Sequence, residues 1–154
     1  MLLNFEDDTP FATGVATYDA EPIPGGDDTQ RIRVYIEVDE ELEQAILDTG
    51  GQYFWCTQEM VGRVAFSETI GDKKINLKGQ DVRGTLARIS IVLLADEGES
   101  LRLEVTAFLP DLNQEFGPAF LPFPYLGFHN CMDRARFAID PSQDQNKIYF
   151  GAQP

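Results

Sequence analysis

Residues 31–51 have the sequence RIRVYIEVDEELEQAILDTGG. In its first part, apolar residues alternate with Arg, Tyr and Glu, which is the period-two pattern of a strand with one buried face. Asp39-Glu40 indicates a turn, and the apolar run 45–47 predicts a returning strand that stops at Asp48. The stretch therefore predicts two neighbouring strands, the second of which leads directly into an ionisable residue. The alternating apolar positions are Ile32, Val34, Ile36 and Val38.

Further short strands are predicted along the rest of the chain. Residues 75–77 and 84–94 are expected to form the arms of a hairpin whose turn spans 78–83. The stretch 101–107 alternates again between apolar and polar residues. A final hairpin is predicted to join 137–139 to 148–150, through a turn over 140–146.

Helical signals are few. Thr57 is a suitable N-cap for a short helix over 58–61, and 130–136 is compatible with one or two helical turns. Residues 110–124 are rich in Pro and Phe and are expected to form a loop. Many short strands with so few helices predict an all-β domain, either closed or sandwich-like.

The chain has the size of a single domain. It contains 154 residues, of which 43% are hydrophobic, and this is enough to bury a core without disulfides or metals. Residues 1–30 carry several Pro, Gly and Asp residues and are predicted to be an irregular N-terminal lead-in. The folded domain is expected to span 31–151.

Charge and residue counts narrow the classes of function. The net charge of −14 argues against nucleic-acid and membrane partners. We expect no signal peptide and no membrane-spanning segment, which favours free thiols at Cys56 and Cys131 and a cytoplasmic location. Because His129 is the only histidine, no multi-histidine zinc site is possible, and we expect neither a metal nor a cofactor.

The sequence Ile46-Leu47-Asp48-Thr49-Gly50 is the sharpest chemical feature. Since desolvation disfavours a charged carboxylate, an aspartate directly after a buried strand must be hydrogen-bonded, paired or functional. Gly50 and Gly51 permit a tight turn and the close approach of another backbone segment. An ordinary β-turn that begins with Asp remains an alternative interpretation.

This motif and three later features, taken in order, make the sequence similar to the retropepsin-like aspartic peptidases. Besides Asp48-Thr49-Gly50, the family has two bulky residues and a glycine nearer the C-terminus, here Tyr125-Leu126-Gly127. Between the two motifs lies a glycine-flanked flap hairpin, here at 78–84, and a short helix, a strand and a final hairpin follow. The resemblance covers roughly 31–151 and implies a small closed acid-protease barrel with a flap and one or two short helices.

The resemblance also implies roles for individual residues. Asp48, Thr49 and Gly50 would form the catalytic turn, and Tyr125, Leu126 and Gly127 would support it. Gly51 departs from the Ala, Ser or Thr usual in the family, and would widen the pocket beside the catalytic group. Substrate-binding residues would be Gly51 and the flap residues Lys78, Gly79, Gln80, Asp81 and Val82.

The implied activity is that of an aspartic endopeptidase. Since the chain carries a single Asp-Thr-Gly, a second copy would supply the other carboxylate, in a homodimer that cleaves a peptide or protein substrate. The strand 148–150 is a candidate for the inter-subunit sheet. Two alternatives stay open, namely a non-catalytic peptide- or partner-binding domain of the same fold and a small-molecule-binding β-barrel. The phenylalanines of the 116–124 loop could line a cleft, an interface or a satellite core.

Overall fold

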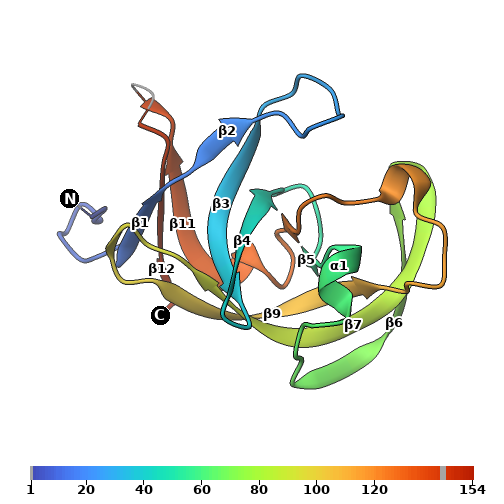
Figure 1. Cartoon of the computed structure of the whole chain (residues 1–154). Coiled ribbons are helices and arrows are strands. Elements are labelled where there is room, and N and C mark those ends of the chain that lie inside the picture. The colour runs from blue at the N-terminus through green and yellow to red at the C-terminus, as the bar shows by residue number, and fades with distance from the viewer. Residues whose placement is uncertain (1, 143–144) are drawn as a thin grey trace.

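The computed structural model describes residues 2–142 and 145–154 and has an all-β architecture, as predicted from the sequence (Figure 1). In these ranges, helices are limited to α1 and two short 3₁₀ segments. The strands are β1 (Gly14–Thr17), β2 (Asp19–Glu21), β3 (Arg31–Val38), β4 (Glu41–Leu47), β5 (Phe54–Trp55), β6 (Glu68–Leu77), β7 (Gln80–Leu93), β8 (Glu97–Gly98), β9 (Leu101–Pro110), β10 (Tyr125–Leu126), β11 (Ala135–Asp140) and β12 (Lys147–Ala152). The helical segments are α1 (Gln58–Val61), η1 (Gly117–Ala119) and η2 (Met132–Arg134).

The main sheet closes into a barrel. Its strands β3, β4, β10, β5, β9 and β7 are hydrogen-bonded in that order, and β3 also pairs with β7. The closing register joins Ile36 to Leu93 and Val38 to Ile91, and all four side chains are buried in the core. The alternation seen in the sequence thus places one face of these strands inside a closed barrel, because successive side chains of a strand point to opposite faces.

A second sheet has the order β11-β12-β1-β8. It lies at the opposite end of the molecule from the β6–β7 hairpin (Figure 1). Ile148 and Phe150 of β12 are buried in the same hydrophobic cluster as the barrel residues Ile36 and Ile91. The two sheets therefore share one core.

The predicted helices agree well with the structure. Thr57 is the N-cap of α1, and its side-chain oxygen accepts a hydrogen bond from the Met60 N–H at 3.2 Å. Such a cap satisfies one of the free N–H groups in the first turn. The 130–136 segment contains only η2, a single 3₁₀ turn.

Two predictions about strands were wrong. The N-terminal lead-in is not irregular throughout, since β1 and β2 lie in it and pair with β12, β8 and β3. The short strand Gly14–Thr17 shows no alternation, because its partners bury three of its four residues in a row. Strand β12 has β11 on one edge and β1 on the other, so 148–150 has no free edge to offer a second subunit.

The turn of the central hairpin is narrower than predicted. It spans Lys78-Gly79 rather than 78–83, and both residues have positive φ, at 53° and 80°. This conformation matches the right-handed twist of the flanking strands, so the ladder runs up to the Leu77–Gln80 pair. The polar residues of 80–83 belong to the strand β7.

No helix in the described ranges has both the length and the apolar character needed to cross a membrane.

Candidate functional site

The segment 48–51 is a tight turn at the end of β4. The Asp48 N–H donates to the Leu126 carbonyl at 2.9 Å, so the aspartate is anchored where the strand ends. The Gly51 N–H donates to the Asp48 carbonyl at 3.1 Å, and the Gly50 N–H donates to Asp48 Oδ1 at 3.2 Å. Backbone bonds therefore fix both the main chain and the carboxylate of Asp48.

Strand β10 supports this turn. It runs parallel to β4 and antiparallel to β5, with Leu126 opposite both Leu47 and Phe54. The Gly127 N–H donates to the Tyr53 carbonyl at 2.9 Å. A Cβ atom on Gly127 would collide with that same carbonyl oxygen, so only glycine fits here. The predicted support of the turn by Tyr125-Leu126-Gly127 thus has a geometric counterpart in these contacts.

Asp48 lies at the wall of a cavity of about 220 Å³. Much of the wall is formed by aromatic and aliphatic side chains. Trp55 and Tyr125 are cross-strand neighbours in it, Ile75 and Leu77 belong to β6, and Leu121 belongs to the long loop. Among the described residues that line it, Asp48 alone carries a carboxylate. The lining residues are Asp48, Gly50, Gly51, Gln52, Trp55, Ile75, Asn76, Leu77, Leu121, Tyr125 and Gly127.

Tyr125 supplies a hydroxyl to this environment. Burial raises the pKa of Tyr125, the positive charge of Arg31 lowers it, and the negative charge of Asp48 raises it. The net direction is upward, so the hydroxyl keeps its proton at neutral pH and can donate a hydrogen bond.

The predicted flap residues lie outside this cavity. Lys78 and Gly79 form the exposed tip of the hairpin. Gln80 donates to the Glu115 carbonyl, and Asp81 pairs with Lys74 at 3.8 Å. Val82 is only 1% exposed and packs in a small apolar cluster. Their contact with a substrate stays a prediction, whereas Gly51 does line the cavity.

Several lining residues were missed in the sequence. Ile75 and Leu77 were assigned to a hairpin arm, and their i, i+2 spacing was the available signal that both point to one face. Trp55 also forms part of the wall. Leu121 gave no signal, because a single apolar residue in a Pro- and Phe-rich loop has no periodicity to mark it.

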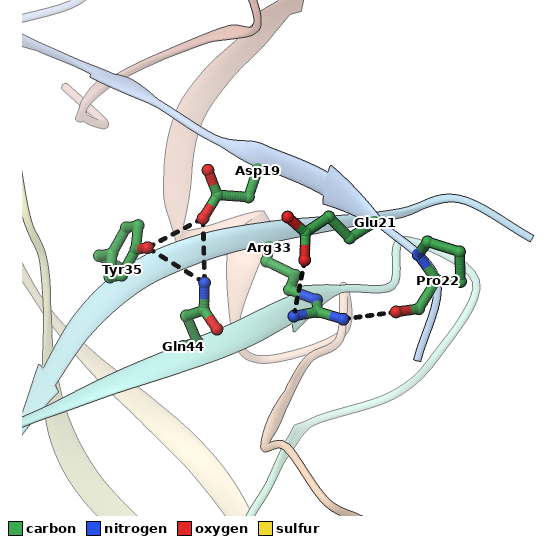
Figure 2. Close-up of polar contacts among 6 residues, drawn as sticks. All are labelled: Asp19, Glu21, Pro22, Arg33, Tyr35 and Gln44. Atoms are coloured by element: carbon green, nitrogen blue, oxygen red, sulfur yellow. Dashed lines mark hydrogen bonds and ion pairs between the residues drawn. The ribbon is translucent and has the colours of Figure 1, made fainter. Parts of the chain in front are cut away.

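A buried arginine contacts the segment after β2 (Figure 2) and also the long loop. Arg33, on β3, donates from its guanidinium to the Pro22 carbonyl at 2.5 Å and lies 3.5 Å from the Glu21 carboxylate. It also stacks over the Phe123 ring at 4.6 Å. Next to Phe123, the Pro124 carbonyl accepts the Ile46 N–H at 2.9 Å. The loop is thus fixed to β4 two residues before Asp48.

Beside this arginine, Asp19 joins three strands (Figure 2). Its carboxylate accepts the Tyr35 hydroxyl at 2.8 Å and the Gln44 side-chain amide at 3.0 Å. Because these residues come from β2, β3 and β4, they hold the first part of the barrel together.

The other chemically interesting residues lie away from the Asp48 cavity. Cys56 and Cys131 are free and fully buried, as expected, and burial raises the pKa of each thiol to about 12. His129 is exposed, and its ring meets Tyr53 edge-on at 5.5 Å. Among the described residues, no group of three or more His, Cys, Asp or Glu side chains could hold a metal ion.

Comparisons of the sequence with known proteins identify no family for this chain. No family model matches the chain, and no curated protein matches it either. Among solved structures, the chain is similar to the crystal structure of a retropepsin-like aspartic protease from Rickettsia conorii, with a TM-score of 0.46 and 15% identity over 90% of this chain and 95% of that chain.

Proposed function

We propose that this chain is one subunit of a homodimeric aspartic endopeptidase, in which two Asp48 carboxylates, one from each copy, activate a water molecule. The observation that carries the proposal is the position of Asp48. Its carboxylate lies at the wall of an apolar cavity, on a turn that hydrogen bonds from both the turn itself and β10 hold in place. Such fixed placement is what a catalytic group requires.

The chemistry needs two carboxylates that act as a pair. Like charges about 3 Å apart cannot both ionise, so the two groups share one proton. The ionised carboxylate takes a proton from water, whose oxygen attacks the amide carbonyl, while the protonated carboxylate donates to the carbonyl oxygen. Collapse of the tetrahedral intermediate breaks the C–N bond as a carboxyl group protonates the leaving nitrogen. The pair titrates as a unit.

A second copy is needed because the cavity of one chain offers a single described carboxylate. Thr49 and Gly50 at the tip of the turn are exposed in the single chain, so another chain can reach them. Phe128, next to the turn, is 45% exposed although it is large and apolar. A two-fold axis that passes beside Asp48 would bury these three residues and bring the two carboxylates together.

The cavity favours a peptide with a large apolar side chain next to the scissile bond. Its aromatic and aliphatic walls are formed by Trp55, Ile75, Leu77 and Leu121. A volume of about 220 Å³ is sufficient for one side chain of the size of Leu or Phe. The peptide backbone would extend along β6, as in other complexes that bind by strand addition.

The first test compares the native chain with Asp48→Asn on a diverse peptide mixture, at mildly acidic and neutral pH and at high protein concentration. Asp28→Asn is the matched control, because this aspartate lies in the exposed 22–30 loop. Cleavage that Asp48→Asn abolishes and Asp28→Asn retains would support the peptidase. Cleavage that survives in Asp48→Asn would refute the role of Asp48.

One observation favours a second candidate, a binding domain without catalysis. In the single chain the cavity is formed and apolar, yet its described lining holds only half of the acid pair. If sedimentation shows a monomer at every concentration, and peptides bind without being cleaved, the binding function replaces the peptidase.

A further inference from the structure

The tip of the β6–β7 hairpin extends beyond the barrel. The ladder between β7 and β9 begins at the Gly84–Pro110 pair, whereas β7 itself begins at Gln80. In the described part of the chain, residues 80–83 pair with no strand other than β6. A two-stranded ribbon of this kind is marginally stable in water by itself.

The side chain of Gln114 takes the place of the missing strand. Its Oε1 accepts the Arg83 N–H at 3.0 Å, and its Nε2 donates to the Arg83 carbonyl at 2.6 Å. The same Nε2 donates to the Asp111 carbonyl at 2.8 Å, and the Asp111 N–H donates to the Arg83 carbonyl at 2.9 Å. One primary amide thus bonds to both backbone groups of Arg83, of which the carbonyl also has a backbone donor at Asp111.

Two more contacts join the same segments. The Gln80 side-chain amide donates to the Glu115 carbonyl. Val82, 1% exposed, packs in one cluster with Ala119 and Leu121 of the loop. The hairpin and the 111–121 loop consequently form a continuous wall on one side of the cavity.

This wall supplies lining residues from both of its parts. Ile75 and Leu77 come from the hairpin, and Leu121 comes from the loop. A change in the distance between the two segments would alter the width of the cavity beside Asp48. The contacts at Arg83 set that distance.

We propose that Gln114 is a positioning residue, whose amide clamps the hairpin to the 111–121 loop so that the two segments act as one lid along the side of the Asp48 cavity. The hairpin then does not open alone, and substrates enter when the whole lid moves. The clamp itself follows from the contacts above, whereas its effect on substrate binding rests on the proposed peptidase function.

The direct test is amide hydrogen exchange at Arg83, measured by NMR in the native chain and in Gln114→Ala. Since each net hydrogen bond contributes modestly and this pair is exposed, we expect the protection factor of the Arg83 N–H to fall about tenfold. Gln153→Ala is the matched control, because the Gln153 amide also donates to a backbone carbonyl, that of Asp133, at 2.6 Å. It should leave Arg83 unchanged.

Gln114→Glu separates the clamp from simple loss of packing. The carboxylate of this variant could still accept from the Arg83 N–H, but it would face the carbonyl oxygens of Arg83 and Asp111 without a proton to donate. Repulsion from these oxygens should move the side chain away and lower the protection of the Arg83 N–H at neutral pH. On acidification the carboxyl group regains a donor, so protection at Arg83 should recover towards that of the native chain. A side chain that acted only by filling space would show no such pH dependence.

The outcomes distinguish this proposal from the peptidase function. If Arg83 keeps its protection in Gln114→Ala, or if the whole β6–β7 ladder loses protection equally, the clamp is refuted whatever the cleavage assay shows. If Arg83 alone loses protection while the native chain cleaves no peptide, the clamp stands and the peptidase function fails. If the native chain does cleave, Gln114→Ala should raise KM with little change in kcat.

Discussion

Replacing Arg33 by Met tests how the buried cation stabilises the barrel beside the site. The Arg33 side chain is only 7% exposed, and its guanidinium contacts Pro22 and Glu21 (Figure 2). It also lies over the Phe123 ring. Its Nε atom is buried and has no hydrogen-bond partner among the described residues. Methionine keeps most of the apolar stem and removes the charged head.

The opposing contributions can be compared. The charged hydrogen bond to the Pro22 carbonyl is worth about 1.5–3 kcal/mol, and the stacking on Phe123 about 0.5–2 kcal/mol. The ion pair adds at most about 1 kcal/mol, because the Glu21 side chain is 65% exposed and solvent screens it. Against these, the unpaired Nε costs about 1–3 kcal/mol, which methionine would recover. We expect Arg33→Met to lower the free energy of unfolding by about 2 kcal/mol, as the difference between these contributions.

Urea unfolding at neutral pH measures this difference, and a double-mutant cycle with Phe123→Leu assigns the part that comes from stacking. Glu21→Gln is the control, with an expected loss below about 0.5 kcal/mol. If Arg33→Met is as stable as the native chain, desolvation of the guanidinium outweighs its contacts and the reasoning is refuted.

Three further predictions concern other parts of the fold. Because burial raises the pKa of Cys56 and Cys131 from 9.0 to about 12, their stabilisation is complete below pH 9.0 and is lost as the pH rises towards 12, by about 1.4 kcal/mol per pH unit for each thiol. Unfolding free energies measured between about pH 8 and 10.5 should therefore fall more steeply for the native chain than for the double Ala variant; equal slopes would contradict this. Gly127→Ala should lower the free energy of unfolding by about 3 kcal/mol or more, since its Cβ would collide with a backbone carbonyl. A midpoint of thermal unfolding close to that of the native chain would contradict this. Val82→Ala should cost about 2 kcal/mol in urea unfolding, against less than about 0.5 kcal/mol for the exposed Lys78→Ala, and similar losses would show that Val82 is not core.

Local signals predicted local structure well. The period-two alternation of 31–38 and the N-cap Thr57 depend on interactions within a few residues, and both appear in the structure. The two-residue turn at Asp39-Glu40 has positive φ at both positions, as a tight hairpin requires. Local signals did not predict strand β1. Its four residues form a strand by pairing with β12 and β8, which are distant in sequence.

The candidate site was predictable only in part, because several of its contacts join segments that are distant in sequence. The turn at Asp48 stood out because an ionisable residue followed by glycines ends an apolar strand, whereas the segment 125–127 was identified only through the resemblance to a family. A closed barrel was expected from the resemblance, but the sequence did not indicate that β3 and β7 would be the strands that close it. The bond between Gln114 and Arg83 likewise joins residues 31 positions apart, and a glutamine in a loop has no pattern that reveals its partner.

Glycine at two positions explains how a carboxylate comes to lie in an apolar wall. The Asp48 N–H donates to the Leu126 carbonyl, and between Asp48 and β5 the chain passes Gly127 so closely that the Tyr53 carbonyl leaves no room for a side chain there. Within the turn, a Cβ on Gly51 would stand 2.9 Å from Asp48 Oδ2, closer than such atoms approach in folded proteins. Gly51 therefore leaves space for the carboxylate in the orientation that accepts the Gly50 N–H. A larger residue at position 51 would push the carboxylate away from the turn that holds it.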